Sequence, residues 1–147
     1  MAAFNKINDW AKNACTTANL ATDQFVIALS NTAPGSESSP TTTDDNGVLA
    51  NVTQISYTNC STRNVSTTSF DQAAGVAKLI VADLTLTASG GSVGPFRYVY
   101  LYDDTPTSPA DPLVGYWDHG SAVTVPDGGS YVIDSDQTNG IWSHTVS

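Results

Sequence analysis

The side chains best suited to catalysis lie close together in the last third of the chain. Asp118, His119 and Ser121 are the residue types that form the nucleophilic triad of many hydrolases. A triad requires its members to converge beside an oxyanion site, whereas adjacent residues in a tight turn point apart. We therefore interpret Asp118-His-Gly120 as a turn and His144 as an exposed strand residue. No catalytic residue is assigned, and we do not expect an enzyme.

Carboxylates also gather in the second half of the chain, at Asp103, Asp104, Asp111, Asp118, Asp134 and Asp136. Calcium prefers several oxygen ligands of this kind, and two carboxylates across a cleft can hydrolyse a glycosidic bond. The sequence has no twelve-residue Asp-x-Asp-x-Asp-Gly loop, however, and aspartate is a preferred turn residue. We favour turns and expect no metal and no cofactor, with calcium as the alternative.

A glycine-rich turn precedes a row of tyrosines. Gly90-Gly91-x-x-Gly94 lacks the lysine and the following helix of a phosphate-binding loop, so it predicts a turn. Tyr98, Tyr100 and Tyr102 alternate along the chain and would share one face of a strand with Phe96. Such a row can stack sugars or bases, but with few basic neighbours it favours a sheet or subunit interface.

The elements that position these residues are mostly strands. Period-two alternation predicts strands over 84–88 and 96–102, joined as a hairpin by the turn at 89–95. Both faces of the second strand are largely apolar, so we expect a central strand whose second face is covered by another sheet or a partner subunit. A buried strand is predicted over 24–30 and a polar edge strand over 62–70.

The remaining segments complete an all-β chain. Three- and four-residue spacing of apolar side chains predicts one helix over 3–16, and the polar stretch 35–46 predicts a solvated loop. Residues 48–57 carry weak helical and strand signals. Three prolines make 103–112 a surface loop, and further strands are expected at 113–117, 122–125, 131–133 and 141–146, with a turn at 126–129. The pattern predicts a β-sandwich or a jelly-roll-like barrel with a short N-terminal helix.

Composition limits the classes of function. The 147 residues suit a single domain, 1–147, with a helical arm over 1–18 and the β-sandwich over 19–147. A net charge of −9 argues against direct nucleic-acid binding, and no stretch is apolar enough to cross a bilayer. Without a secretory leader, we expect Cys15 and Cys60 to be free thiols of a protein made in the cytoplasm, although one disulfide is the alternative.

Three segments carry a resemblance to a known family. They are Phe25-Val-Ile-Ala-Leu-Ser-Asn-Thr-Ala-Pro34, the run from Thr87-Ala-Ser-Gly-Gly to Phe96-Arg-Tyr-Val-Tyr-Leu-Tyr102, and Asp111-Pro-Leu-Val-Gly-Tyr-Trp-Asp-His-Gly-Ser121. Together they resemble small virion structural proteins of tailed bacteriophages. A longer insert at 105–110 departs from that pattern. The resemblance implies a virion protein on the outer surface of the capsid, synthesised in the host cytoplasm.

Within that context we expect a head decoration, or cement, protein. Its partner would be the major capsid protein, and a homotrimer at local threefold axes would bridge neighbouring capsid subunits. Aromatic anchors dominate interface energies, so the interface candidates are Phe4, Ile7, Trp10, Tyr98, Tyr100, Tyr102 and Trp117. The alternative for the N-terminal helix is that it closes an open end of the barrel.

A second hypothesis is a tail- or fibre-associated module that binds a host surface glycan. Aromatic side chains beside Asp and Asn residues would be its signature, and Tyr116, Trp117 and His119 are the nearest candidates. A rise in the thermal stability of the particles on addition of the purified protein would favour the first hypothesis. Localisation of the protein at the tail tip would favour the second.

Overall fold

The fold is an all-β sandwich, as predicted. The structure is a computed structural model that describes residues 2–38 and 45–147. Over these ranges the chain forms ten strands in three antiparallel sheets, together with one α-helix and one short 3-10 helix. Of the helices described, none is both long and apolar enough to span a membrane.

One layer is a five-stranded sheet. Its strand order is β1 (Phe4–Lys6), β8 (Leu113–Val125), β7 (Val93–Asp103), β2 (Phe25–Ser30) and β3 (Asn64–Val65). The middle strand β7 pairs with β8 on one side and with β2 on the other, which confirms the predicted central strand. All six residues of β2 are buried, because this strand lies inside the sheet with both faces covered.

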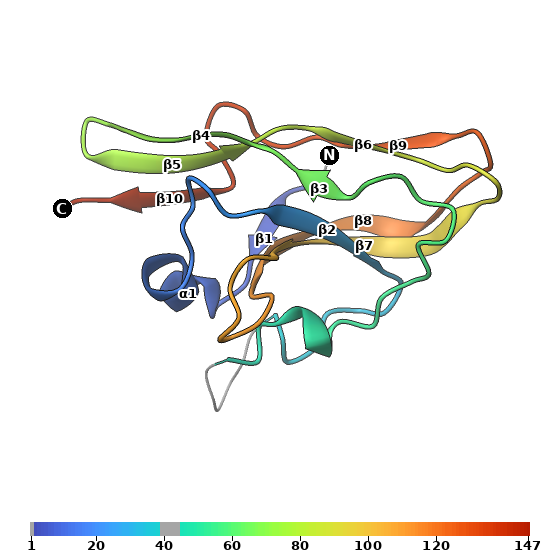
Figure 1. Cartoon of the computed structure of the whole chain (residues 1–147), viewed down its shortest axis with the longest axis horizontal. Helices are drawn as coiled ribbons and strands as arrows, with labels where there is room; N and C mark the ends of the chain where they lie inside the picture. Colours follow the sequence, from blue (N-terminus) through green and yellow to red (C-terminus); the bar gives the residue numbers. More distant parts are fainter. Residues whose placement is uncertain (1, 39–44) are drawn as a thin grey trace.

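The second layer consists of two smaller sheets side by side. Strands β10 (Trp142–Thr145), β5 (Val76–Val81) and β4 (Thr67–Ala73) form one, and β6 (Leu84–Thr87) and β9 (Ser130–Ile133) form the other. Figure 1 shows both above the five-stranded sheet. The main apolar core fills the space between the layers, where Ile27, Leu79 and Leu101 are fully buried.

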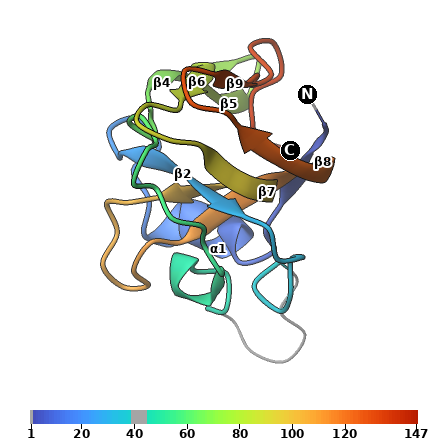
Figure 2. The same ribbon diagram turned by 90° about the vertical axis from the view of Figure 1, so that its right-hand side faces the viewer.

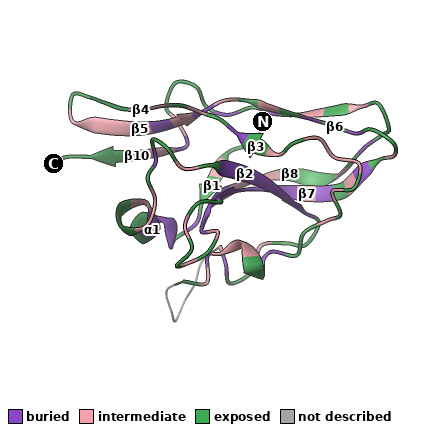
Figure 3. Cartoon of the chain, viewed as in Figure 1, coloured by how far each residue is buried: buried purple, intermediate pink, exposed green. Residues whose placement is uncertain are grey.

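The outer face of the five-stranded sheet is covered by irregular chain rather than by another sheet. A second apolar cluster packs there, including Tyr98, Tyr100 and Tyr102 of β7, with Val52 and Leu49 from the segment around the 3-10 helix η1 (Leu49–Asn51). Figure 2 shows η1 beneath the sheet, and Figure 3 shows that β2 and much of β7 are buried. The tyrosine face is thus covered from within the same chain.

The predicted helix over 3–16 is wrong in its first half. Phe4–Lys6 is strand β1, paired with β8 through the Cα partners Phe4 and Trp117, and only Trp10–Thr16 is the helix α1. The apolar side chains at positions 4, 7 and 10 fit a helical spacing, but Gly115 of β8 leaves the room that the Phe4 ring and the β1 backbone occupy. Strand pairing with β8 therefore overrides the local periodicity.

The predicted hairpin of 84–88 and 96–102 is also wrong, although both segments are strands. β6 pairs with β9, whereas β7 pairs with β8 and β2 in the other layer. The glycine turn at 89–92 crosses from one layer to the other, and Gly90 adopts a positive φ of 82° there. Local alternation identified the strands, but it carries no information on non-local partners.

A single long strand, β8, replaces the predicted strands 113–117 and 122–125. Between the pairs Tyr98↔Asp118 and Phe96↔Val123, β8 has four residues (119–122) where β7 has only Arg97. Asp118-His-Gly120 is therefore the start of an irregular bulge within a strand rather than a turn between two strands. The irregular register also moves Phe96 into the main core, away from the face of Tyr98.

Other sequence predictions fare differently. Strands β3 and β4 lie at sheet edges, as expected for the polar segment 62–70, and residues 103–112 do connect β7 with β8. Residues 55–57 form no strand. The turn at 126–129 exists but joins β8 to β9 in the other layer. Of the predicted loop 35–46, residues 39–44 lie outside the described part of the chain.

Candidate interaction surfaces

Most of the predicted interface residues are buried within the chain itself. The exposed fraction is 1% for Ile7, 0% for Trp10, 7% for Tyr98, 1% for Tyr100, 5% for Tyr102 and 3% for Trp117. Phe4 alone among the seven candidates is half-buried. These side chains form the two cores, so the expectation that they are exposed anchors for a partner is corrected.

Trp10 shows why α1 stays on the body of the protein. Its indole contacts the rings of Phe25 and Trp142 edge-on, each with centroids 6.4 Å apart. Phe25 belongs to the five-stranded sheet and Trp142 to β10 in the facing layer, so the indole lies where the two layers meet. The helix closes one end of the sandwich, which is the alternative that the sequence had left open.

The tyrosine row has a polar partner that the sequence did not reveal. The Tyr100 hydroxyl donates a hydrogen bond of 3.0 Å to Oε1 of Glu37, which is 6% exposed. The same carboxylate accepts the backbone N–H of Gly35. Burial, followed by the nearby Glu37 charge, raises the pKa of Tyr100 well above its usual range. This pair ties residues 35–37 to the sheet.

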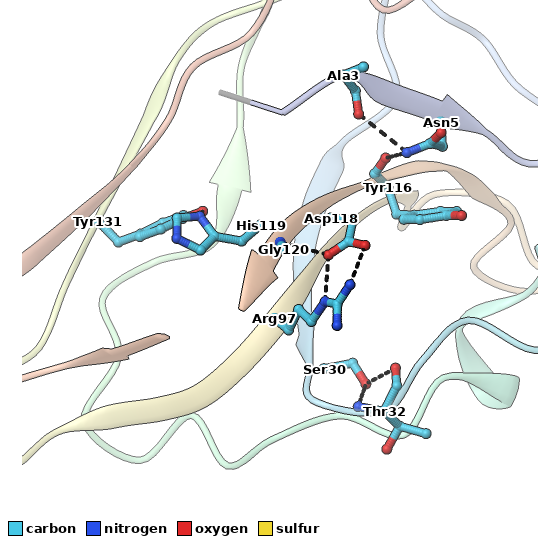
Figure 4. Close-up of polar contacts among 10 residues, drawn as sticks. All are labelled: Ala3, Asn5, Ser30, Thr32, Arg97, Tyr116, Asp118, His119, Gly120 and Tyr131. Atoms are coloured by element: carbon cyan, nitrogen blue, oxygen red, sulfur yellow. Dashed lines mark hydrogen bonds and ion pairs between the residues drawn. The ribbon is translucent and has the colours of Figure 1, made fainter. Parts of the chain in front are cut away.

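Asp118 and His119, which were not assigned to a catalytic triad from the sequence, contact different partners. Arg97 donates to both carboxylate oxygens of Asp118, at 2.7 and 2.9 Å, and the Gly120 N–H donates to the same group at 2.8 Å. His119 points away, toward the Tyr131 hydroxyl 3.2 Å from its Nδ1 (Figure 4). The hydrogen bonds from Arg97 and then from Gly120 lower the pKa of Asp118. The carboxylate therefore stabilises the bulge in β8.

A pocket of about 450 Å³ opens at the seam between β1 and the β9–β10 connection. Phe4 and Trp117 form one wall, with ring centroids 4.6 Å apart, and Lys6 lies beside them with its ammonium 5.4 Å from the Trp142 ring. Asp134 and Asp136 also line the pocket. The pocket combines an aromatic wall with charges of both signs.

Several strand edges face solvent. In the three-stranded sheet β10 and β4 are the outer strands, and residues 143–147 of the C-terminal segment are all exposed. Val146 and Val132 are the large apolar side chains with the greatest exposure, at 76% and 52%. In the other layer β1 covers only residues 115–117 of β8. Exposed edges of this kind carry backbone groups able to pair with another chain.

The other candidate groups are placed as follows. Cys15 is exposed, Cys60 is half-buried, and both are free thiols, as predicted. Within residues 2–38 and 45–147, no three or more His, Cys, Asp or Glu side chains converge on a position that could hold a metal ion.

Comparisons with protein-family models, with curated proteins and with solved structures found no match to this chain.

Proposed function

We propose that this protein is a decoration, or cement, protein of a tailed-bacteriophage head. It binds the outer surface of the capsid and bridges neighbouring copies of the major capsid protein. The sequence resemblance supplies the virion context. The structural observation that supports the proposal is the exposed edge of β10, which leaves a strand of the second layer open to pairing with another chain.

The register of β10 shows which backbone groups are available. The Val146 N–H donates to the Gly75 carbonyl, and antiparallel pairs alternate between hydrogen-bonded and non-hydrogen-bonded residues. Counting back along β10, Ser143 and Thr145 oppose Lys78 and Val76 in non-hydrogen-bonded pairs, so their N–H groups point away from β5. An extended segment of a capsid subunit can add to this edge by strand pairing.

Charge and copy number fit the same role. A net charge of −9 favours the outside of a shell over contact with packaged DNA. Many identical weak contacts on a shell give high avidity, and a homotrimer at the local threefold axes would engage three subunits at once. The trimer is part of the proposal.

The test is addition of purified protein to capsids that lack it. We expect saturable binding, a higher disruption temperature of the particles, and density on the outer surface in a cryo-electron map. Ser143→Pro removes an outward N–H at a position where an edge strand tolerates proline, and should weaken binding at least about tenfold. Ser143→Thr keeps the N–H and serves as the matched control.

Both variants must first melt within a few degrees of the parent protein. Failure of the unmodified protein to bind capsids would overturn the proposed function, whereas equal binding by the two variants would overturn only the role of β10.

The seam pocket supports a second candidate function, a tail- or fibre-associated module that binds a host surface glycan. Aromatic walls and carboxylates are the usual means of holding sugar rings and hydroxyls, and Trp117 lines this pocket. Tyr116 and His119 are not among the lining residues. Localisation of the protein at the tail tip, together with glycan binding that Phe4→Ala abolishes, would favour this function.

A further inference from the structure

A buried carboxyl group lies at the end of β7. Asp103 is the last residue of that strand and the Cα partner of Phe25, the first residue of β2. The pairs Leu29↔Val99 and Ile27↔Leu101 place both members in the main core, so Asp103 lies at the end of the same face. Its exposed fraction is 0%. A carboxylate in this position has lost the water that would hydrate its charge.

The hydrogen bonds of Asp103 account for only one of its two oxygens. Oδ1 accepts the N–H of Thr105 at 3.2 Å. Oδ2 is buried and receives no hydrogen bond from a donor group of the described residues. The segment that carries Asp23 lies against this end of β7, because the Gln24 carbonyl accepts the Asp104 N–H at 2.9 Å. The Asp23 carboxyl, whose own Oδ2 accepts the Asn19 N–H at 2.6 Å, therefore acts on Asp103 from this segment. Two carboxyl groups can form a hydrogen bond only if one of them carries a proton.

The surroundings favour the protonated form. Burial is the largest cause and raises the pKa of Asp103 to about 7, the Thr105 N–H opposes it, and the charges of Asp23 and Asp104 raise it further. Asp23 acts from the segment between α1 and β2, and Asp104 acts from the β7–β8 loop. Phe25 is the Cα partner of Asp103 on β2, and the Asp103 N–H donates to the Pro112 carbonyl.

We propose that Asp23 and Asp103 share one proton and form a pH-sensitive latch between the α1–β2 segment and the end of the central strand. With the proton in place, the pair holds residues 19–24 against β7. When the proton leaves, the half-buried Asp23 charge faces a second charge on the fully buried Asp103, and the segment that carries Asp23 moves away from β7. This latch is independent of the proposed capsid role.

The direction of the pH effect follows from proton linkage. The folded protein binds this proton more tightly than the unfolded chain, in which Asp103 ionises near its ordinary value of about 3.9. The stabilisation is therefore complete below about pH 4, declines as the pH rises toward about 7, and is absent above that range. Most carboxylates that stabilise a folded protein do so at higher pH and lose the effect as the pH falls. A gain of stability on acidification therefore identifies the buried Asp103.

The test compares melting temperatures from pH 5 to pH 9 for the parent protein, Asp103→Asn and Asp23→Asn. Either amide can donate to the remaining carboxylate without a shared proton. We expect both variants to melt at least about 5 °C above the parent at pH 8 and to approach it at pH 5. Asp71→Asn, which removes one exposed charge in β4, is the matched control and should follow the parent at every pH.

A second measurement observes the latch directly. In carbon-13 NMR the Asp103 carboxyl should titrate near neutral pH in the parent, and amide exchange over residues 19–24 should accelerate above that midpoint. A midpoint below pH 5, or variants that follow the parent at pH 8, would overturn the proposal. It is equally overturned if added calcium, rather than acid, stabilises the parent at pH 8 and has no effect on Asp103→Asn.

Discussion

At the scale of single residues, Glu37 is a buried carboxylate that binds the tyrosine face of the five-stranded sheet. It is the only glutamate in the chain, and it lies in a stretch of Ser, Thr, Pro and Asp that predicts a solvated loop. Its carboxylate is nevertheless buried and accepts hydrogen bonds from Tyr100 and Gly35. Buried acceptors without donors are costly, so the Tyr100 hydroxyl is a structural requirement of this cover.

Tyr100→Phe tests that requirement. The ring remains, but Glu37 loses a donor, and we expect the free energy of unfolding to fall by about 1–2 kcal/mol in urea titrations. Tyr116→Phe is the matched control, because its ring lies 5.4 Å from that of Tyr100 and its hydroxyl forms no hydrogen bond with the described residues. Equal losses in the two variants would contradict the assigned role of Tyr100.

At the scale of elements, α1 is held by packing, and Trp10 is its largest buried side chain. It is a short helix without a side-chain cap at its first turn, so its stability must come from packing rather than from its own hydrogen bonds. Trp10 supplies that packing between the two layers. The helix is thus part of the core of the sandwich.

Trp10→Ala should lower the free energy of unfolding by about 3–5 kcal/mol, while Trp10→Phe should recover a large part of that loss. Lys12 lies on the exposed side of the same helix, where it pairs with Asp45, and Lys12→Ala should cost less than about 1 kcal/mol. Chemical denaturation of the three variants gives the comparison. If Trp10→Ala and Lys12→Ala were equally stable, Trp10 would have to act at an interface after all.

The edge strand β1 depends on a missing side chain in β8. A Cβ at Gly115 would lie 2.5 Å from the Asn5 carbonyl oxygen and would also overlap the Phe4 ring. Gly115→Ala should therefore displace β1 and destabilise the protein by about 1–3 kcal/mol. Limited proteolysis with mass spectrometry should show faster cleavage near residues 3–8. Ala122→Ser, an exposed change in the same strand, should leave the cleavage rate unchanged.

The sequence predicted the features that depend on local interactions and missed those that depend on contacts between distant segments. Local alternation and turn residues located β2, β7 and the proline-rich connection, and they gave the fold class. Pairing partners were not accessible, because β6 and β7 are neighbours in sequence but belong to different layers. The burial of the tyrosine row was missed for the same reason: its cover comes from chain more than 40 residues earlier, with Leu49 and Val52 around η1 and Glu37 in the polar segment before it.

At the scale of the whole molecule, acid removes the net negative charge that keeps molecules apart. The net charge of −9 falls toward zero near the sequence isoelectric point of about 4.1, where self-repulsion between molecules is lost. Turbidity should therefore peak close to pH 4, and redissolved protein should give an unchanged β-rich circular dichroism spectrum. A turbidity maximum near pH 6, or loss of the folded spectrum at pH 4, would contradict this expectation.

The two layers leave different strands open to solvent. The five-stranded sheet ends in the short strands β1 and β3, whereas the three-stranded sheet ends in β10 and β4. Short outer strands offer few backbone groups to another chain, so the five-stranded sheet is less open to pairing with one. This asymmetry favours the second layer for the proposed contact with another chain, which we assign to β10 because residues 143–147 are all exposed.

The bulge in β8 has a practical use. Residues 119–122 are all exposed, and the carboxylate before them is held by Arg97 and the Gly120 N–H. Additional residues placed between Ser121 and Ala122 would extend into solvent without interrupting the β1 pairing at 115–117. A short epitope carried there would be presented on a rigid scaffold, and on a particle coated with many copies it would become a dense, regularly spaced antigen array.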